Sequence, residues 1–354
     1  MPPSPWRPVS GCAITICNLR RNELRRQKYD MGFHIRSNLR RGNLPGVLKY
    51  TLGIPFMEAR MCRFSEFRKA KLKVTAEEYR TSGELKRILE RYDKFIVGSD
   101  QVWNPEHNGS DTAFLLDFVP DSGRKIAYAS SFGIDSVPPE LRVPYANALA
   151  GIGGIGVRER AGCRLVKELT GREVPLVVDP VFLPGRAHWE ALADEAPKSE
   201  HPFVFAYTNR KGQSEAFFRE TGFPLKDLEL HKLSSQTSPG DFFHPKVKVS
   251  YSMPPVAFLR NVRDAKLVLT ASFHCLAFSV IYNKPFVCFL TGDAGRDERL
   301  AGLLNELGLE NRVFRPGMTL ADVSAPIDYA RVNARLARMV AESADFLRSA
   351  VEGR

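Results

Sequence analysis

Short apolar runs alternate with longer amphipathic segments from about residue 94 onward. An apolar run that ends at a turn signal predicts a buried strand, and apolar residues three and four apart predict a helix. Before residue 190 the pattern predicts strands at 94–97, 125–128, 155–157 and 176–178, and helices at 139–150 and 159–170. This alternation is typical of parallel βαβ units.

The same pattern begins again after a polar linker, residues 194–201. It predicts strands at 203–207, 228–233, 247–251, 267–270 and 287–290, and helices at 213–221, 255–262, 274–282, 297–307 and 327–351. The sequence therefore predicts an α/β protein of two Rossmann-like domains, residues 1–190 and 191–354, the second ending in a long helix. A chain of 354 residues has the length expected for two domains.

The first 90 residues have weak periodicity until a helix predicted at 77–92. They are rich in arginine: Arg20, Arg21, Arg25, Arg26, Arg36, Arg40 and Arg41. Such a cluster suits an anionic glycan or a membrane surface, although an irregular solvated segment is the simpler interpretation. The whole chain carries a formal charge of +11, which favours an anionic partner without naming one.

Cysteine usage and hydropathy indicate the compartment. The six cysteines form no CxxC pair and no spacing typical of zinc sites, so free thiols in a reducing compartment are expected. No segment approaches the ~18 apolar residues of a transmembrane helix, and no signal-peptide core is evident. We expect a cytoplasmic protein without a metal site.

Chemistry is expected where strands end, because ligands of open α/β sheets bind beyond the carboxyl ends of the strands. The residues that follow predicted strands are 98–105, 130–133, 158–159, 179–180, 272–274 and 291–293. Residues 151–156 match G-x-G-x-x-G, but they follow a helix and lack the acidic residue ~20 positions later that binds ribose. We interpret them as a loop.

Two of these stretches resemble sequence blocks that are characteristic of a known family. Residues 95–105, Phe-Ile-Val-Gly-Ser-Asp-Gln-Val-Trp-Asn-Pro, and residues 270–286 resemble the two signature blocks of the polysaccharide pyruvyl transferase family. Further similar blocks lie at 157–160, 178–183 and 299–312, and the order along residues 92–314 is the family's order. Several blocks in order are more specific than any single pattern.

The resemblance implies a glycosyltransferase-B-like fold, with two Rossmann-like domains facing across a cleft, the first for the acceptor and the second for the donor. It implies phosphoenolpyruvate as donor, with no further cofactor. The acceptor would be a sugar hydroxyl pair of an exopolysaccharide or cell-wall precursor, giving a pyruvate ketal. A glycan or lipid-linked glycan is then the partner, rather than nucleic acid. A lipid-linked acceptor would bring the protein to the inner face of the membrane; the sequence does not set the oligomeric state.

The resemblance also suggests roles for single residues. The reaction needs an acid that protonates carbon 3 of the donor and a base for the attacking hydroxyl. His274 matches the second signature and is the expected acid; Asp100 is the expected base or acceptor-orienting group. The alternatives are a structural histidine and a turn-capping aspartate.

Substrate binding is assigned to six residues: Arg158, Arg299, Ser272, Ser99, Trp103 and Asn104. Arg158 is the first choice for holding phosphate or carboxylate, and pairing with Glu159 or Asp179 is the alternative. Trp103 could pack on a sugar or belong to the core.

Three departures keep other functions open. Cys275 and Ser272 stand where family members commonly have glycine and arginine. Residues 13–17 look like the family's second strand, so the first βα unit is expected to be missing. The alternatives are a nucleotide-sugar glycosyltransferase of the same architecture, or an inactive relative within a polysaccharide assembly complex.

Overall fold

The computed structural model describes residues 14–19, 30–108, 111–233, 241, 243–292 and 294–353. Contacts divide these residues into two compact units. The C-terminal unit consists of Pro180–Ala341, and the N-terminal unit consists of the residues up to Asp179 together with Glu342 onward. The boundary therefore lies about ten residues before the predicted one.

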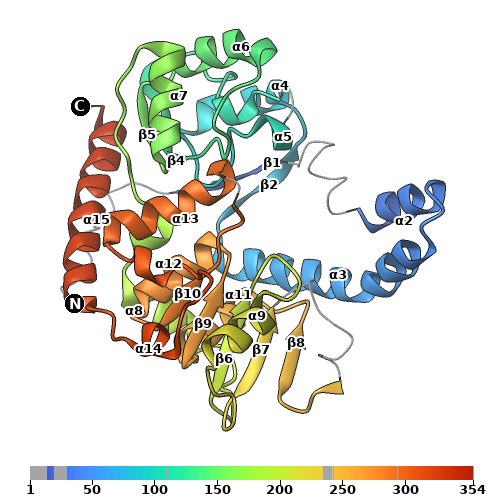
Figure 1. The fold of residues 1–354 in the computed structure, drawn as a ribbon. Coiled ribbons are helices and arrows are strands. Elements are labelled where there is room, and N and C mark those ends of the chain that lie inside the picture. The colour runs from blue at the N-terminus through green and yellow to red at the C-terminus, as the bar shows by residue number, and fades with distance from the viewer. Residues whose placement is uncertain are drawn as a thin grey trace. The chain divides into compact units, whose positions relative to one another are not determined.

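The last turns of the chain belong to the N-terminal unit for a clear reason. They are part of helix α15 (Tyr329–Glu352). Within this unit the Val178 N–H donates to the Ser343 hydroxyl at 2.9 Å, and the ring of Phe346 stacks on that of Tyr128. The predicted long C-terminal helix is confirmed, but its end completes the N-terminal unit (Figure 1).

The N-terminal unit is built around a parallel sheet in the order β3–β4–β5. Every residue of the central strand is buried, which is typical of a parallel strand covered on both faces. The elements are β3 (Phe95–Val97), β4 (Lys125–Ser130), β5 (Gly154–Val157), α5 (Pro105–Asn108), α6 (Pro139–Ala150) and α7 (Arg160–Thr170), with 3₁₀ turns at Ala113–Leu115 and Ser122–Arg124. The strand predicted at 176–178 is reduced to one bridge between Val157 and Leu176.

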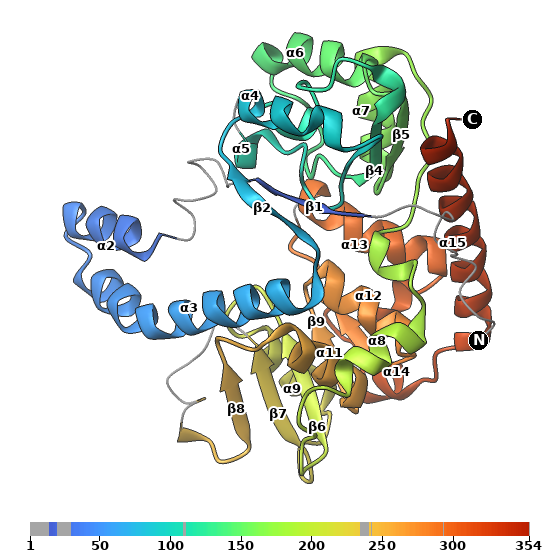
Figure 2. The ribbon, with the colours of Figure 1, turned by 180° about the vertical axis from the view of Figure 1, so that it is seen from behind.

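The start of the unit differs most from expectation. Strands β1 (Ile16–Leu19) and β2 (Val74–Tyr79) form a parallel pair. Between them lie two helices, α2 (Met31–Arg40) and α3 (Leu44–Lys71), side by side in both views (Figures 1 and 2). The interpretation of an irregular segment is therefore wrong for residues 31–71, while Arg20–Arg26 and Ala13 lie outside the described residues. The last two residues of the strand predicted at 13–17 are the first two residues of β1.

The prediction of a helix at 77–92 is also wrong for its first residues. Thr81 is extended and its hydroxyl accepts the Glu84 N–H, so the helix begins only after this cap. The residues before the cap form β2. After it come α4 (Ser82–Leu85) and the 3₁₀ segment Lys86–Arg91.

The C-terminal unit contains a five-stranded parallel sheet in the order β10–β9–β6–β7–β8. Its strands are β6 (Phe203–Tyr207), β7 (Glu229–Leu233), β8 (Val247–Ser250), β9 (Leu267–Thr270) and β10 (Phe286–Cys288). Its helices are α8 (Arg186–Ala193), α9 (Gln213–Thr221), α11 (Pro255–Asp264), α12 (Phe273–Ile281), α13 (Ala294–Leu307) and α14 (Leu320–Ser324), with 3₁₀ turns at Pro180–Phe182 and Glu310–Arg312. These elements confirm the α/β class with Rossmann-like domains.

The strand order places a topological switch point in this sheet. From β6 the chain proceeds through β7 to β8 on one side, and then returns to add β9 and β10 on the other side. Strands β6 and β9 are therefore neighbours. The connection after β6 leads toward one edge of the sheet, and the connection after β9 leads toward the other edge. Such a point opens a crevice at the carboxyl ends of the two central strands, the usual ligand position in these sheets.

Candidate functional site

The loop after β3 presents Asp100. Gly98 has φ +130°, and a Cβ there would lie 1.9 Å from the carbonyl oxygen of Tyr128, so only glycine lets the loop approach β4 this closely. Asp100 itself has φ 68°, a left-handed conformation that aspartate tolerates better than most residues. Its carbonyl accepts the N–H groups of Val102 and Ser131, which fixes the backbone of the turn.

Arg158 connects this turn to Asp179, the residue that follows the strand predicted at 176–178. Its guanidinium donates to the Asp179 carboxylate at 2.7 Å and to the Asp100 carboxylate at 3.0 Å. The side chains of Arg158 and Asp179 are each 1% exposed, whereas that of Asp100 is 61% exposed. The chain Asp179–Arg158–Asp100 therefore runs from the core to the surface and ends in an accessible carboxylate.

The carboxylates of this network stabilise the charged form of Arg158. Burial alone would lower the pKa of Arg158, but the carboxylates of Asp179, Asp100 and Glu159 outweigh it and raise that pKa. The arginine is therefore a permanent cation. Burial and the nearby charge of Asp179 also raise the pKa of Tyr128, so this phenol stays neutral.

The pairing between Arg158 and Asp179 is the alternative that the sequence left open. Both ends of the guanidinium contact carboxylates, so in this structure Arg158 holds Asp100 in place. Ser99 joins the same network, because its hydroxyl donates to Asp179 at 3.0 Å. The structure thus brings Ser99, Asp100 and Arg158 together around a buried aspartate.

Two expected sugar-contact residues belong to the interior instead. Trp103 is 0% exposed, donates its indole N–H to the Phe114 carbonyl and packs against Phe132. Asn104 is 2% exposed and its side-chain oxygen accepts the N–H of Glu106. Neither has surface to offer a sugar, so these two assignments are corrected: Trp103 is a core residue and Asn104 shapes the turn into α5.

Sequence reasoning placed Glu159 after a predicted strand and considered it only as a partner of Arg158. Its carboxylate accepts the N–H of Phe132 at 3.0 Å, and so ties the loop after β4 to the loop after β5. It is the second residue after the strand predicted at 155–157, so the rule that selected Arg158 also included it, without assigning this contact.

At the switch point of the C-terminal unit, helix α12 begins directly after β9. The Ser272 N–H donates to the Thr270 hydroxyl, which also donates to the Tyr207 carbonyl at the end of β6. Ser272 is the N-cap residue, yet its side chain caps no N–H group of the helix. His274 lies in the first turn and is partly exposed. The first N–H groups of a helix attract anions, so this end of α12 suits a phosphate or carboxylate.

A cation missed by sequence reasoning lies at the same edge. Arg210 is the third residue after β6, is exposed, and donates to the Thr291 carbonyl in the loop after β10. Asp297, also missed, accepts the N–H groups of Thr291 and Gly292 at 2.7–2.8 Å. It shapes that loop from the first turn of α13. The predicted Arg299 follows two residues later in α13 and is partly exposed.

The cysteine that departs from the family pattern is inert. Cys275 and Cys288 are 0% exposed, and burial raises the pKa of each thiol to about 12. A thiol of this kind carries almost no thiolate near neutral pH. Cys275 therefore packs the interior of α12 and takes no part in chemistry.

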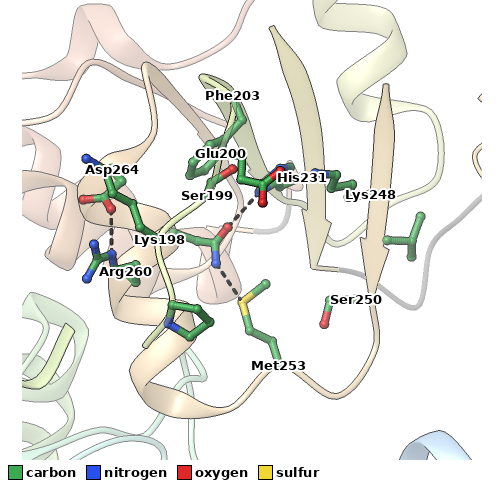
Figure 3. Close-up of a pocket in the computed structure, with 13 residues that line it drawn as sticks. Lys198, Ser199, Glu200, Phe203, His231, Lys248, Ser250, Met253, Arg260 and Asp264 are labelled. Atoms are coloured by element: carbon green, nitrogen blue, oxygen red, sulfur yellow. Dashed lines mark hydrogen bonds and ion pairs between the residues drawn. The ribbon is translucent and has the colours of Figure 1, made fainter. Parts of the chain in front are cut away.

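A separate cavity of about 440 Å³ lies in the C-terminal unit, next to the start of β6 and beneath α11 (Figure 3). The His231 ring stacks on Phe203 at 4.0 Å, and its two nitrogens contact Asn261 and Glu229. Lys248 pairs with the same Glu229. These polar groups are engaged with one another, and the lining extends from Phe203 at the start of β6 to Ser250 at the end of β8.

Two general features complete the description. Among the described residues, no group of three or more His, Cys, Asp or Glu side chains could hold a metal ion. Within the same part of the chain, no helix combines the length and the apolar composition needed to cross a bilayer.

Comparison with solved structures finds matches at low identity and low TM-score. A protein described as a UDP-N-acetylglucosamine 2-epimerase from Listeria monocytogenes is 13% identical over 96% of each chain, with a TM-score of 0.44. The glycotransferase of kitacinnamycin is 14% identical over 83% of this chain and 93% of its own, with a TM-score of 0.41. A DNA-modifying β-glucosyltransferase is 11% identical over 96% of this chain and 95% of its own, with a TM-score of 0.34.

Comparison with curated protein sequences returned no match. The profile of the polysaccharide pyruvyl transferase family, in contrast, matches residues 19–293. The match includes the Asp179–Arg158–Asp100 network and the switch point with His274. It covers well over half of the 354 residues. This chain therefore belongs to the polysaccharide pyruvyl transferase family and is a transferase.

Proposed function

We propose that the protein transfers the pyruvyl group of phosphoenolpyruvate to two hydroxyls of one sugar, in an exopolysaccharide or cell-wall precursor, and forms a cyclic ketal. The observation that carries the proposal is the Asp179–Arg158–Asp100 network. It places one accessible carboxylate, backed by a buried ion pair, at the carboxyl end of a parallel sheet.

Asp100 suits the role of the base that accepts the proton of the attacking hydroxyl. Its carboxylate is largely exposed, while one of its oxygens is oriented by Arg158 at 3.0 Å. The remaining lone pairs can accept from a sugar hydroxyl. Arg158 does not contact the acceptor in this scheme; it is a positioning residue that directs the Asp100 carboxylate.

The C-terminal unit suits the donor. The first N–H groups of α12 and the cation of Arg210 favour the phosphate and carboxylate of phosphoenolpyruvate. Arg299 in α13 is a further cation for this anion. His274, in the first turn of α12, is the proposed acid that protonates carbon 3.

The proposed steps balance. Carbon 3 gains a proton from His274 and becomes a methyl group, while the first sugar oxygen bonds to carbon 2 and gives its proton to Asp100. The C2–O bond to phosphate then breaks. The second hydroxyl bonds to carbon 2 and loses its proton. Of the two hydroxyl protons, one returns to His274 and the other leaves with the phosphate as hydrogen phosphate, so Asp100 is again a carboxylate. No electron is exchanged with a cofactor.

The nature of the acceptor indicates where in the cell the reaction would take place. A precursor of an exopolysaccharide or cell wall is assembled from activated sugars, so we place the reaction in the cytoplasm. A lipid-linked glycan acceptor would require the enzyme to work at the inner face of the membrane.

The test measures phosphate release from phosphoenolpyruvate with a panel of glycan acceptors, and detects the ketal by mass spectrometry. Asp100→Asn keeps the shape of the loop but removes the base, so we expect turnover to fall about 10²–10⁴-fold. His274→Gln should reduce turnover comparably. The control is Asp135→Asn, a change to a carboxylate outside the network, which should leave turnover unchanged.

A binding measurement separates the donor from the acceptor role. Phosphoenolpyruvate at ~100 times its dissociation constant should stabilise the protein by roughly 2.7 kcal/mol. This stabilisation should persist in Asp100→Asn and weaken in Arg210→Ala. Stabilisation by nucleoside diphosphates but not by phosphoenolpyruvate would reject the proposal in favour of a nucleotide-sugar glycosyltransferase. Indifference to both, in folded protein, would favour an inactive relative.

A further inference from the structure

Helices α2 and α3 form a helical hairpin, residues 30–73, that buries none of its described side chains. It is nevertheless an ordered pair. The rings of His34 and Tyr50 stack at 4.8 Å, and the side chains of Asn38 and Asn43 form a hydrogen bond of 2.7 Å. The hairpin therefore has an inner face, where α2 and α3 meet, and outer faces that no other described side chain covers completely.

The outer face of α3 is apolar. Leu44, Leu48, Leu52 and Phe56 stand four residues apart and are 69%, 60%, 64% and 50% exposed. At 3.6 residues per turn, four-residue spacing forms one continuous ridge, and Leu48 and Leu52 point roughly opposite to Tyr50 on the inner face. The ridge is thus directed away from α2.

Exposed apolar side chains are concentrated in this hairpin. Nine of the fifteen large exposed hydrophobic residues in the described part of the chain belong to it: Phe33, Leu39, Leu44, Leu48, Leu52, Phe56, Met61, Phe64 and Leu72. Scattered exposed apolar residues are ordinary, but a continuous patch marks a surface that another phase or molecule covers.

Charge selects the kind of partner. Residues 30–73 contain ten Lys or Arg residues and only three Asp or Glu residues. The hairpin alone therefore accounts for +7 of the chain's formal charge of +11. Lys and Arg beside an apolar row of Leu and Phe are typical of helices that lie in the interface of an anionic bilayer.

We propose that the α2–α3 hairpin docks this protein on an anionic lipid surface, with the ridge from Leu44 to Phe56 inserted among the lipids and the basic residues close to the head groups. A second copy of the chain fits less well, because two such hairpins would bring the same excess of positive charge together. A soluble polyanion would explain the charge but not the apolar ridge. The inference is independent of the proposed pyruvyl transfer.

The test is flotation of the full chain with vesicles. We expect binding to phosphatidylcholine vesicles that contain phosphatidylglycerol, and little binding to pure phosphatidylcholine. High salt should weaken binding, because it screens exposed charges. Each Lys or Arg near an anionic surface strengthens binding about fivefold, so Arg40→Gln with Arg41→Gln should weaken it roughly 25-fold.

The apolar ridge is tested by Leu48→Ala with Leu52→Ala, which keeps helix propensity while removing two inserting side chains. We expect vesicle binding to weaken tenfold or more. Matched controls change the same chemistry elsewhere. Val143→Ala removes a side chain that is 68% exposed in α6, and Arg331→Gln with Arg338→Gln removes two exposed charges from α15. Neither control should alter binding.

Three outcomes would overturn the inference. The first is absence of binding to anionic vesicles by folded protein, and the second is equal weakening by the control variants. The third is concentration-dependent dimerisation, without vesicle binding, that the leucine variant abolishes. Circular dichroism of each variant establishes that the chain is folded. Failure here would leave the enzymatic assay unaffected, and failure of that assay would leave vesicle binding unaffected.

Discussion

Replacing Asp179 with asparagine tests whether the buried ion pair holds the N-terminal unit and its exposed carboxylate together. Asp179 accepts from Arg158 at 2.7 Å and from the Ser99 hydroxyl at 3.0 Å. Its side chain and that of Arg158 are each 1% exposed. The variant keeps the volume and one oxygen acceptor, but it leaves the buried guanidinium without its closest counter-charge.

The expected loss in the free energy of unfolding follows from this geometry. Removing one partner of a buried pair costs about 3–5 kcal/mol, because the other charge stays buried without compensation. Asp100 still contacts the guanidinium, and the asparagine oxygen can still accept a hydrogen bond, so we expect the lower end, about 3 kcal/mol. With a urea slope of about 1–3 kcal/mol/M, the unfolding midpoint should fall by roughly 1 M or more.

The assay is urea unfolding combined with hydrogen exchange, since two units need not unfold together. Exchange should accelerate in residues 95–104 and 155–179 and stay unchanged in the five-stranded sheet. The control is Asp194→Asn, which removes a carboxylate that is 65% exposed and pairs with Arg260 and Arg263. An exposed partner of this kind should cost no more than about 1 kcal/mol.

The reasoning would be refuted by an Asp179→Asn variant whose midpoint matches the control. That result would mean that Asp100 alone compensates Arg158, and that the buried pair does not position the loop. Activity adds a second criterion. Asp179→Asn should reduce turnover because the Asp100 carboxylate loses its rigid support, while the affinity for phosphoenolpyruvate stays unchanged.

Three further predictions concern titrating groups. A hydrogen bond to Glu66 raises the pKa of the exposed Cys62 thiol, so Glu66→Gln should speed its alkylation at pH 8, measured by mass spectrometry. Cys275 and Cys288, whose pKa values burial raises to about 12, should be alkylated only after unfolding; labelling of native protein would contradict this. Burial alone would raise the pKa of Asp264, but its arginine neighbours lower it below the ordinary 3.8. The stability that the Asp264 carboxylate contributes should be present above pH ~4 and disappear in more acidic solution. In Asp264→Asn the free energy of unfolding, measured by urea denaturation at several pH values, should therefore fall less on acidification.

Most of the fold beyond residue 94 could be predicted because its elements bury a distinct face. The helices at 139–150 and 213–221 have the predicted bounds, since each has buried residues at helical spacing and ends next to a glycine. Residues 31–71 could not be predicted in the same way. Their helices bury no described side chain. The row from Leu44 to Phe56 has helical spacing, but it is exposed and no second apolar row accompanies it as it would on a buried helix face.

The site was predicted in part. Reading the residues after each strand led to Asp100 and Arg158 and included Glu159. The same reading applied after the strand at 203–207 would also have led to Arg210. It could not decide between Trp103 as a sugar platform and Trp103 as core, because an aromatic residue beside a functional turn suits both. Burial decides this, and burial depends on packing against Phe132 that no local pattern reveals.

The network also gives a physical reason for reading three of the separate sequence blocks as one feature. The blocks at 95–105, 157–160 and 178–183 supply Asp100, Arg158 and Asp179 in turn, and the contacts among them span 58 residues or 21 residues of sequence. A change in any one leaves the others with an unbalanced buried charge or a misdirected carboxylate. The chemistry attributed to Asp100 is thus a property of the assembled parallel strands. A chain that retains the first block but lacks an acidic residue at the position of Asp179 should fold less stably and present no oriented base.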